Sequence, residues 1–242
     1  MKKYKANAWS NVDSYLTIAE VIVPERNRTM KLLVDVFGYH FETKECLSLL
    51  DIGCGDGIVS DRIRDRYRKI SFFLLDGSLE MLEKAKKRLK GRNVTFIHQS
   101  FEEYTALAAE KEKYDFVYSA HAIHHLDLVG KSKLYQKIFN ELKPGGLFLN
   151  IDPVLPPSEK SETWQFKMWR DWINETLHQK GFKSDIGKYD NVPYHYKSNE
   201  ENKPSSLSEQ LELLEEIGFQ NVDCFYKFSV IAIFGGTKQG SH

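Results

Sequence analysis

The residues best suited to bind a ligand stand between two apolar segments near position 50. Asp51 lies in the end of the first segment, and Gly53, Gly55 and Gly57 alternate directly after it. Glycine permits positive φ and lets a ligand approach the backbone where a Cβ would collide. The helical pattern that follows offers free N–H groups and the positive end of a helix dipole. This arrangement predicts a ligand site at the junction of a strand and a helix.

A second acid indicates what kind of ligand binds there. Asp76 ends the next apolar run, and in a doubly wound sheet an acid about twenty residues after such glycines holds the ribose hydroxyls of a nucleoside. A dinucleotide fingerprint would need a third glycine where this chain has Ile58. Asp51 would repel a pyrophosphate but attract an ammonium or sulfonium group. The pattern therefore predicts a nucleoside cofactor other than a dinucleotide.

The run from Leu49 to Gly57 resembles the first motif of the class I S-adenosylmethionine-dependent methyltransferases. The resemblance covers residues 46–152 strongly and 204–237 moderately. It implies that S-adenosylmethionine is the cofactor and S-adenosylhomocysteine the product. By this resemblance Asp51, Gly53 and Gly55 contact the methionine portion, Asp76 accepts the ribose hydroxyls, and Gly77 lies against the adenine.

Two further segments extend the resemblance, one of them with a departure. Many relatives place an Asp after the third strand to take the adenine amine, and this chain has Ser100 there. The Ser100 hydroxyl and the Phe101 N–H are the expected substitutes. Ser119 and Ala120, at the end of the fourth strand, are expected beside the methionine portion.

A group of histidines follows the fourth strand, near the expected entry of the methyl acceptor. The imidazole pKa lies near neutrality, so one of these rings could take a proton from the acceptor. We expect His124 and His125 to act as general base or substrate contact, and His121 to contact substrate. The alternative is that each histidine caps the loop or packs under the sheet edge. The spacing does not indicate a metal site.

Strand-like and helix-like segments alternate, which predicts a parallel sheet with crossover helices. With the resemblance, this predicts an α/β fold: a doubly wound, mostly parallel seven-stranded sheet whose seventh strand is antiparallel. The expected strands are Leu47–Ile52, Ile70–Asp76, Val94–His98, Tyr114–Ser119, Leu147–Ile151, Val222–Lys227 and Val230–Phe234. Helices are expected over Asp56–Tyr67, after Ser78 as N-cap, through Leu134 and Ile138, and over Leu207–Ile217. Pro144-Gly145-Gly146 is expected to form a turn.

The chain divides into four expected segments. Residues 1–45 form an N-terminal helical segment, 46–152 the cofactor-binding core, 153–203 a cap insertion, and 204–238 the closing helix and strands. An apolar arc too wide for one core contact, with Trp164, Met168 and Trp172 clustered on it, marks the cap helix. We expect substrate contacts from Trp9, Tyr15, Trp164, Trp169 and Tyr194. The alternative is that these side chains fill a cap core or a dimer interface.

Composition limits the partners. The 242 residues carry a formal net charge of +0, so no overall field attracts nucleic acid or an anionic membrane. The 3 cysteines include no C-x-x-C pair, which indicates a reducing, cytoplasmic location without a disulfide framework or zinc site. Neither a signal peptide nor a membrane-spanning run is apparent. We expect a monomer or homodimer acting on a small-molecule substrate.

The sequence thus predicts methyl transfer to a small molecule by in-line displacement in a capped pocket, with the acceptor atom open. One alternative is a protein that binds the cofactor as a sensor or scaffold without catalysis. The other is a methyltransferase of RNA or protein. A minor possibility is an enzyme that converts the cofactor into another sulfonium.

Overall fold

The computed structural model describes residues 18–44, 46–67, 69–90 and 93–240. Its centre is a 7-stranded sheet in the order β3-β2-β1-β4-β5-β7-β6, with β7 antiparallel to its neighbours. The strands are β1 Leu47–Ile52, β2 Ile70–Asp76, β3 Val94–His98, β4 Tyr114–Ala120, β5 Leu142–Pro153, β6 Gln220–Phe228 and β7 Ile231–Thr237. The expected doubly wound fold is therefore confirmed.

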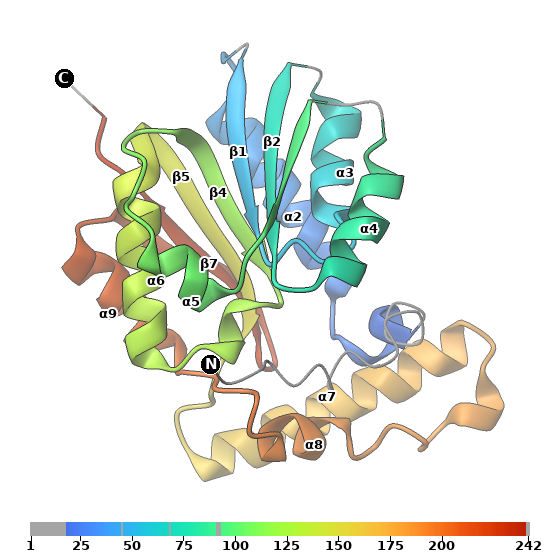
Figure 1. The fold of residues 1–242 in the computed structure, drawn as a ribbon. Helices are drawn as coiled ribbons and strands as arrows, with labels where there is room; N and C mark the ends of the chain where they lie inside the picture. The colour runs from blue at the N-terminus through green and yellow to red at the C-terminus, as the bar shows by residue number, and fades with distance from the viewer. Residues whose placement is uncertain (1–17, 45, 68, 91–92, 241–242) are drawn as a thin grey trace.

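Helices cover both faces of the sheet (Figure 1). Their bounds are α2 Arg26–His40, α3 Ile58–Arg66, α4 Leu79–Arg88, α5 Phe101–Ala106, α6 Leu128–Glu141, α7 Glu159–Gln179, α8 Val192–Ser198 and α9 Leu207–Ile217. Two short 3-10 turns are η1 Ile123–His125 and η2 Lys183–Asp185. The side chains of α2, α3 and α4 share one apolar cluster with one face of the strands, and α5, α6 and α9 contribute to a second cluster on the other face.

Alternation along the strands explains why both clusters form. Successive side chains of a strand point to opposite faces, and in β1 Leu49 joins the first cluster while Leu50 and Ile52 join the second. Because both faces of β1, β2 and β4 are buried, these strands are largely apolar, as is typical of parallel sheets.

Helix α7 and the short α8 lie beyond the end of the sheet at which β5 finishes (Figure 1). The buried apolar face of α7 carries Phe166, Trp169, Ile173 and Leu177, a helical spacing. Trp169 Nε1 donates to the carbonyl oxygen of Ile22 at 2.7 Å. The expected wide apolar arc is used unevenly. The face centred on Trp169 packs on the core, Trp172 is partly buried against the same cluster, and Trp164 is exposed.

The structure also corrects several element bounds. Helix α3 begins at Ile58 rather than at Asp56, because Gly57 before it has φ 74° and cannot continue a right-handed helix. Strand β5 begins at Leu142, five residues earlier than expected, and includes the expected turn at Pro144–Gly146 as an irregularity. Its pairing with β4 shifts between Tyr114 opposite Leu142 and Phe116 opposite Leu147. Ser78 caps α4 as expected, accepting from Met81 N at 3.3 Å.

Candidate functional site

A cavity of about 510 Å³ lies at the carboxyl ends of β1, β2 and β4. In open α/β sheets, ligands bind where the strand order reverses, which here is between β1 and β4. The loop after β1, the start of α4, the segment after β3, the loop after β4 and helix α2 all contribute to the walls.

Of the three glycines after β1, Gly53 and Gly55 line this cavity. Gly53, Gly55 and Gly57 have φ of 67°, 54° and 74°, the left-handed region that favours glycine. A Cβ at Gly53 would lie 2.3 Å from the Cβ of Ala122, so the loop after β4 requires glycine there. A Cβ at Gly55 would meet no atom within 4 Å and would occupy the space next to the backbone. That space is a cradle for a ligand.

Asp76 fixes this loop from the end of β2. Its Oδ2 accepts the N–H of Gly55 at 2.8 Å, and its Oδ1 accepts the N–H of Ser78 at 2.8 Å. Burial raises the pKa of the carboxyl, and these two hydrogen bonds act in the opposite direction. Because each carboxylate oxygen has two lone pairs, Asp76 retains acceptor capacity toward the cavity.

Asp51 is almost fully buried at the end of β1 and also lines the cavity. Ser60 Oγ donates to Asp51 Oδ2 at 2.8 Å and lies 2.7 Å from the Tyr118 hydroxyl. Since the Ser60 proton goes to Asp51, the Tyr118 hydroxyl donates to Ser60. Burial raises the pKa of Asp51 to about 7. Among the described residues no cation forms an ion pair with this carboxylate, so a cationic ligand group would suit it.

The loop of residues 121–126, hereafter the histidine loop, contributes His121 and His125 to the cavity. His121 has φ 58°, and its N–H donates to the Ile151 carbonyl oxygen at 2.7 Å. Its Nε2 is buried and makes no hydrogen bond to the described residues. Burial lowers the pKa of His121 to about 3 and that of His125 to about 4. Both rings are therefore neutral at neutral pH.

His124 differs from its two neighbours, since it is not among the residues that line the cavity. Its Nδ1 lies 2.7 Å from Oδ1 of Asp152, a buried carboxylate in β5. The ring packs on His125 with centroids 4.2 Å apart and against Tyr196 of α8 at 5.6 Å. In the described structure His124 supports the histidine loop from behind, which corresponds to the packing alternative in the sequence interpretation.

Most of the other predicted cofactor residues lie together. Gly77, Ser100, Phe101 and Ala120 line the same cavity as Asp51 and Asp76. The Ser100 hydroxyl accepts from Glu103 N at 3.1 Å as the N-cap of α5, so one of its lone pairs is used. Ser119 does not line the cavity. It is fully buried, with Oγ donating to the Ile52 carbonyl oxygen at 2.8 Å, because it points away from the cavity that Ala120 reaches.

The predicted cap contacts do not reach this cavity. The side chains of Trp164 and Tyr194 are 60% and 51% exposed, and Trp169 is buried against the N-terminal segment. Helix α7 uses its apolar face to pack on the core. The substrate contacts expected from these three residues stay a prediction. Trp9 and Tyr15 lie outside the described residues.

Several residues that line the cavity or support it were not predicted, and two of them bear directly on its chemistry. Arg26, at the start of α2, lines the cavity. Asp152 holds His124 from the end of β5. Arg26 lies in the N-terminal segment, which the resemblance did not cover, so no motif indicated it. Asp152 follows directly after the expected fifth strand, and an acid at a buried strand end is the signal that could have indicated it.

The described residues contain no group of three or more His, Cys, Asp or Glu side chains placed to hold a metal ion. In the same part of the chain, no helix is long and apolar enough to cross a membrane. The fold and the site together define a doubly wound α/β protein in which a glycine loop, two carboxylates and two neutral histidines share one cavity.

Comparison with known proteins specifies the class further. A methyltransferase domain matches residues 49–146. Carboxy-S-adenosyl-L-methionine synthase of Trichodesmium erythraeum is 31% identical over 199 residues, which are 78% of this chain and 72% of that protein. Malonyl-[acyl-carrier protein] O-methyltransferase 2 of Ilyobacter polytropus is 30% identical over 48% of this chain. Phosphoethanolamine N-methyltransferase of Plasmodium falciparum is 30% identical over 64% of it. The chain spans only 44% and 52% of these two methyltransferases.

Solved structures show the same fold. An O-methyltransferase family protein from Burkholderia thailandensis superposes with a TM-score of 0.61 at 14% identity, covering 89% of this chain and 57% of that one. The chain belongs to the class I S-adenosylmethionine-dependent methyltransferases.

Proposed function

We propose that this methyltransferase transfers a methyl group from S-adenosylmethionine to a small-molecule acceptor bound beside the histidine loop. The observation that carries the proposal is one cavity that joins Asp51, Gly55 and Asp76 to the neutral rings of His121 and His125. S-adenosylmethionine supplies a methyl group already activated by its sulfonium. The protein therefore mainly has to align the acceptor and exclude water.

The residues of the cavity fit the parts of this cofactor. The buried carboxylate of Asp51 suits the ammonium of the methionine portion, and the guanidinium of Arg26 suits its carboxylate. Asp76 has acceptor capacity left for the ribose hydroxyls. Gly77, Ser100 and Phe101 lie around the segment after β3, where the adenine is expected. The open space at Gly55 allows the ligand to approach the backbone.

On the acceptor side, the neutral histidines can accept hydrogen bonds or a proton. His125 lines the cavity, and its lowered pKa keeps the ring unprotonated at neutral pH. If the acceptor arrives as an alcohol or an ammonium, such a ring can take the proton that methylation requires to leave. The relatives named above include an O-methyltransferase and an N-methyltransferase, which supports an oxygen or nitrogen nucleophile as the acceptor.

Two measurements test the proposal. Isothermal titration should show binding of both S-adenosylmethionine and S-adenosylhomocysteine to the folded protein, and no binding of either would overturn it. A screen of small alcohols, phenols and amines with mass detection of methylated products should then yield at least one acceptor. Tight cofactor binding without turnover of any acceptor would favour a sensor or scaffold.

A second candidate is a reaction on the cofactor itself. The relative matched over 78% of this chain is, by its name, a synthase of carboxy-S-adenosyl-L-methionine, which supports this candidate. In this case a carboxylate donor added with S-adenosylmethionine would yield a heavier sulfonium nucleoside instead of S-adenosylhomocysteine. Mass spectrometry of the nucleoside products distinguishes the two candidates.

A further inference from the structure

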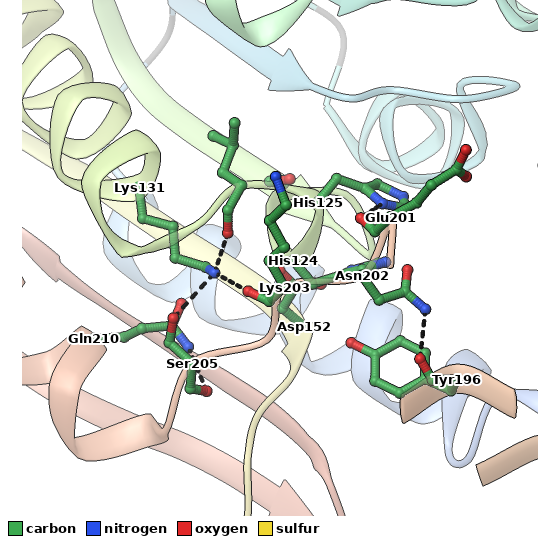
Figure 2. A network of polar contacts seen from close by, with 12 residues as sticks. His124, His125, Lys131, Asp152, Tyr196, Glu201, Asn202, Lys203, Ser205 and Gln210 are labelled. Carbon is green, nitrogen blue, oxygen red and sulfur yellow. Dashed lines mark hydrogen bonds and ion pairs between the residues drawn. The ribbon is translucent and has the colours of Figure 1, made fainter. Parts of the chain in front are cut away.

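A short segment between α8 and α9 crosses the histidine loop and is hydrogen-bonded to it. This segment, residues 201–205 and hereafter the strap, makes two hydrogen bonds to the loop through its backbone. The N–H of Lys203 donates to the carbonyl oxygen of His124 at 2.7 Å. The Nδ1 of His125 lies 3.0 Å from the carbonyl oxygen of Glu201. Figure 2 shows the strap running past both histidines between α8 and α9.

The bond to Glu201 determines the protonation pattern of the His125 ring. A carbonyl oxygen only accepts, so Nδ1 must carry the proton that is donated. In a neutral imidazole the other nitrogen then bears the lone pair. Nε2 is therefore the acceptor nitrogen of a ring that lines the cavity. The position of the strap thus selects which nitrogen of His125 can serve as a base.

Lys131 in α6 joins the strap to the loop. Its side chain is completely buried, which is rare for lysine. Its ammonium donates to the carbonyl oxygen of Leu126 in the histidine loop, to the carbonyl oxygen of Lys203 at 2.6 Å and to Ser205 Oγ at 3.1 Å (Figure 2). These three acceptors match the three protons of an ammonium group.

Burial of the Lys131 ammonium is costly, and apolar side chains often replace buried charges without loss of stability. A buried charge loses its hydration and is retained only where hydrogen bonds or opposite charge compensate it. Burial lowers the pKa of Lys131, and the carboxylate of Asp152 opposes that effect. The same Asp152 holds His124. Asp152 therefore contacts the histidine loop at His124, and Lys131 contacts it at Leu126.

We propose that Lys131 is a positioning residue that holds the strap on the histidine loop and thereby keeps His125 in its Nδ1-protonated form. The proposal rests on the proposed function, in which His125 faces the acceptor. It gives the strap a specific role, because the carbonyl group of Glu201 sets the tautomer of a cavity histidine. Lys131 does not itself contact the cavity, because it is not among the lining residues.

The test substitutes Lys131→Met and follows the imidazole ¹⁵N resonances of His125 by NMR, a readout that needs no acceptor. The wild type should show the Nδ1-protonated tautomer, and K131M should lose it while still binding S-adenosylhomocysteine. The matched control is Lys137→Met. Lys137 is also buried in α6, but it bonds the carbonyl oxygens of Leu107 and Ala108 and pairs with Glu141. K137M should leave the His125 tautomer unchanged.

A wild-type His125 protonated on Nε2, or an unchanged tautomer in a folded K131M, would overturn the proposal. If K131M does not fold, Ser205→Ala, which removes one acceptor of the ammonium, should weaken the same signature in part. Once an acceptor is known, K131M should lower kcat by about tenfold to a hundredfold with little change in KM for the cofactor. Failure of the proposed function would be seen separately, as absent binding of S-adenosylhomocysteine to the wild type.

Discussion

The carboxylate of Asp76 and the amide of Gly55 are joined by a 2.8 Å hydrogen bond between the end of β2 and the loop after β1. The same carboxylate accepts the amide of Ser78 at the start of α4. Asp76 thus fixes the position of the loop after β1, and the same hydrogen bonds orient the Asp76 carboxylate toward the cavity. This geometry explains how an acid at a strand end can be ready for a diol before any ligand binds.

Replacement of Asp76 should therefore weaken cofactor binding strongly. Asp76→Ala removes charge-assisted hydrogen bonds, and we expect the affinity for S-adenosylhomocysteine to fall by about one to two powers of ten. Asp76→Asn, which retains one acceptor oxygen, should have a smaller effect. Asp35→Ala is the control, since Asp35 pairs with Lys31 and Arg66 on the surface. Unchanged affinity in D76A by calorimetry would remove Asp76 from the site.

The elements predicted best from sequence are those whose limits are set locally. The bounds of β1, β2, β3 and α9 agree with the expected ones. The start of α9 is marked by a capping box between Ser206 and Glu209, and its end by Gly218 with φ 112°. The start of β5 was wrong because Leu142 pairs with Tyr114 across an irregularity, and a partner strand is not visible in a local pattern.

Binding of S-adenosylhomocysteine should depend on pH through Asp51. Its pKa of about 7 in the free protein means that half of the carboxyls are protonated near neutrality. The ammonium of the ligand favours the ionised form, so affinity should rise with pH and fall by up to about tenfold per pH unit below about 7. Calorimetry over this range should also detect proton release on binding. Asp51→Asn should bind more weakly and without this pH dependence, and a pH-independent wild type would contradict the assignment.

The cavity residues at the ends of neighbouring strands could be predicted from the sequence. The residues that distant segments of the chain bring to the site could not. Asp51, Asp76 and Ala120 lie at strand ends, which meet at one edge of a parallel sheet. Ser119, next to Ala120, shows how one residue along a strand moves a side chain out of the cavity. Arg26 comes from the N-terminal segment and Glu201 from the strap, and local sequence does not say where either one folds back.

The two cavity histidines should make the protein sensitive to acid. Their pKa values of about 3 and about 4 in the folded protein lie below the ordinary value of 6.5. Below pH 6.5 each ring therefore binds more protons in the unfolded chain than in the folded one, and each lowers the free energy of unfolding as pH decreases, by up to about 1.4 kcal/mol per pH unit. The raised pKa of Asp51 acts in the opposite direction over the same range, so the contribution of a ring is the difference between the wild type and a variant that lacks it. Thermal unfolding followed from neutral pH toward pH 4 tests this.

The matched variant for that measurement is His125→Asn. Its amide can replace the Nδ1 donor to the Glu201 carbonyl but does not titrate. The dependence of its melting temperature on pH should be shallower than that of the wild type. Equal slopes for the two proteins would mean that His125 titrates normally in the folded state.

Substitution of Arg26 can distinguish binding of the amino-acid portion of the ligand from binding of its nucleoside portion. If its guanidinium pairs with the methionine carboxylate, Arg26→Ala should weaken S-adenosylhomocysteine by about tenfold or more, as expected for loss of a charge-assisted pair. The same variant should leave 5′-methylthioadenosine, which lacks the amino-acid portion, almost unaffected. D76A should weaken both ligands, because both retain the ribose. Equal losses for the two ligands in R26A would indicate that Arg26 shapes the cavity rather than binding the carboxylate, since a general distortion does not distinguish them.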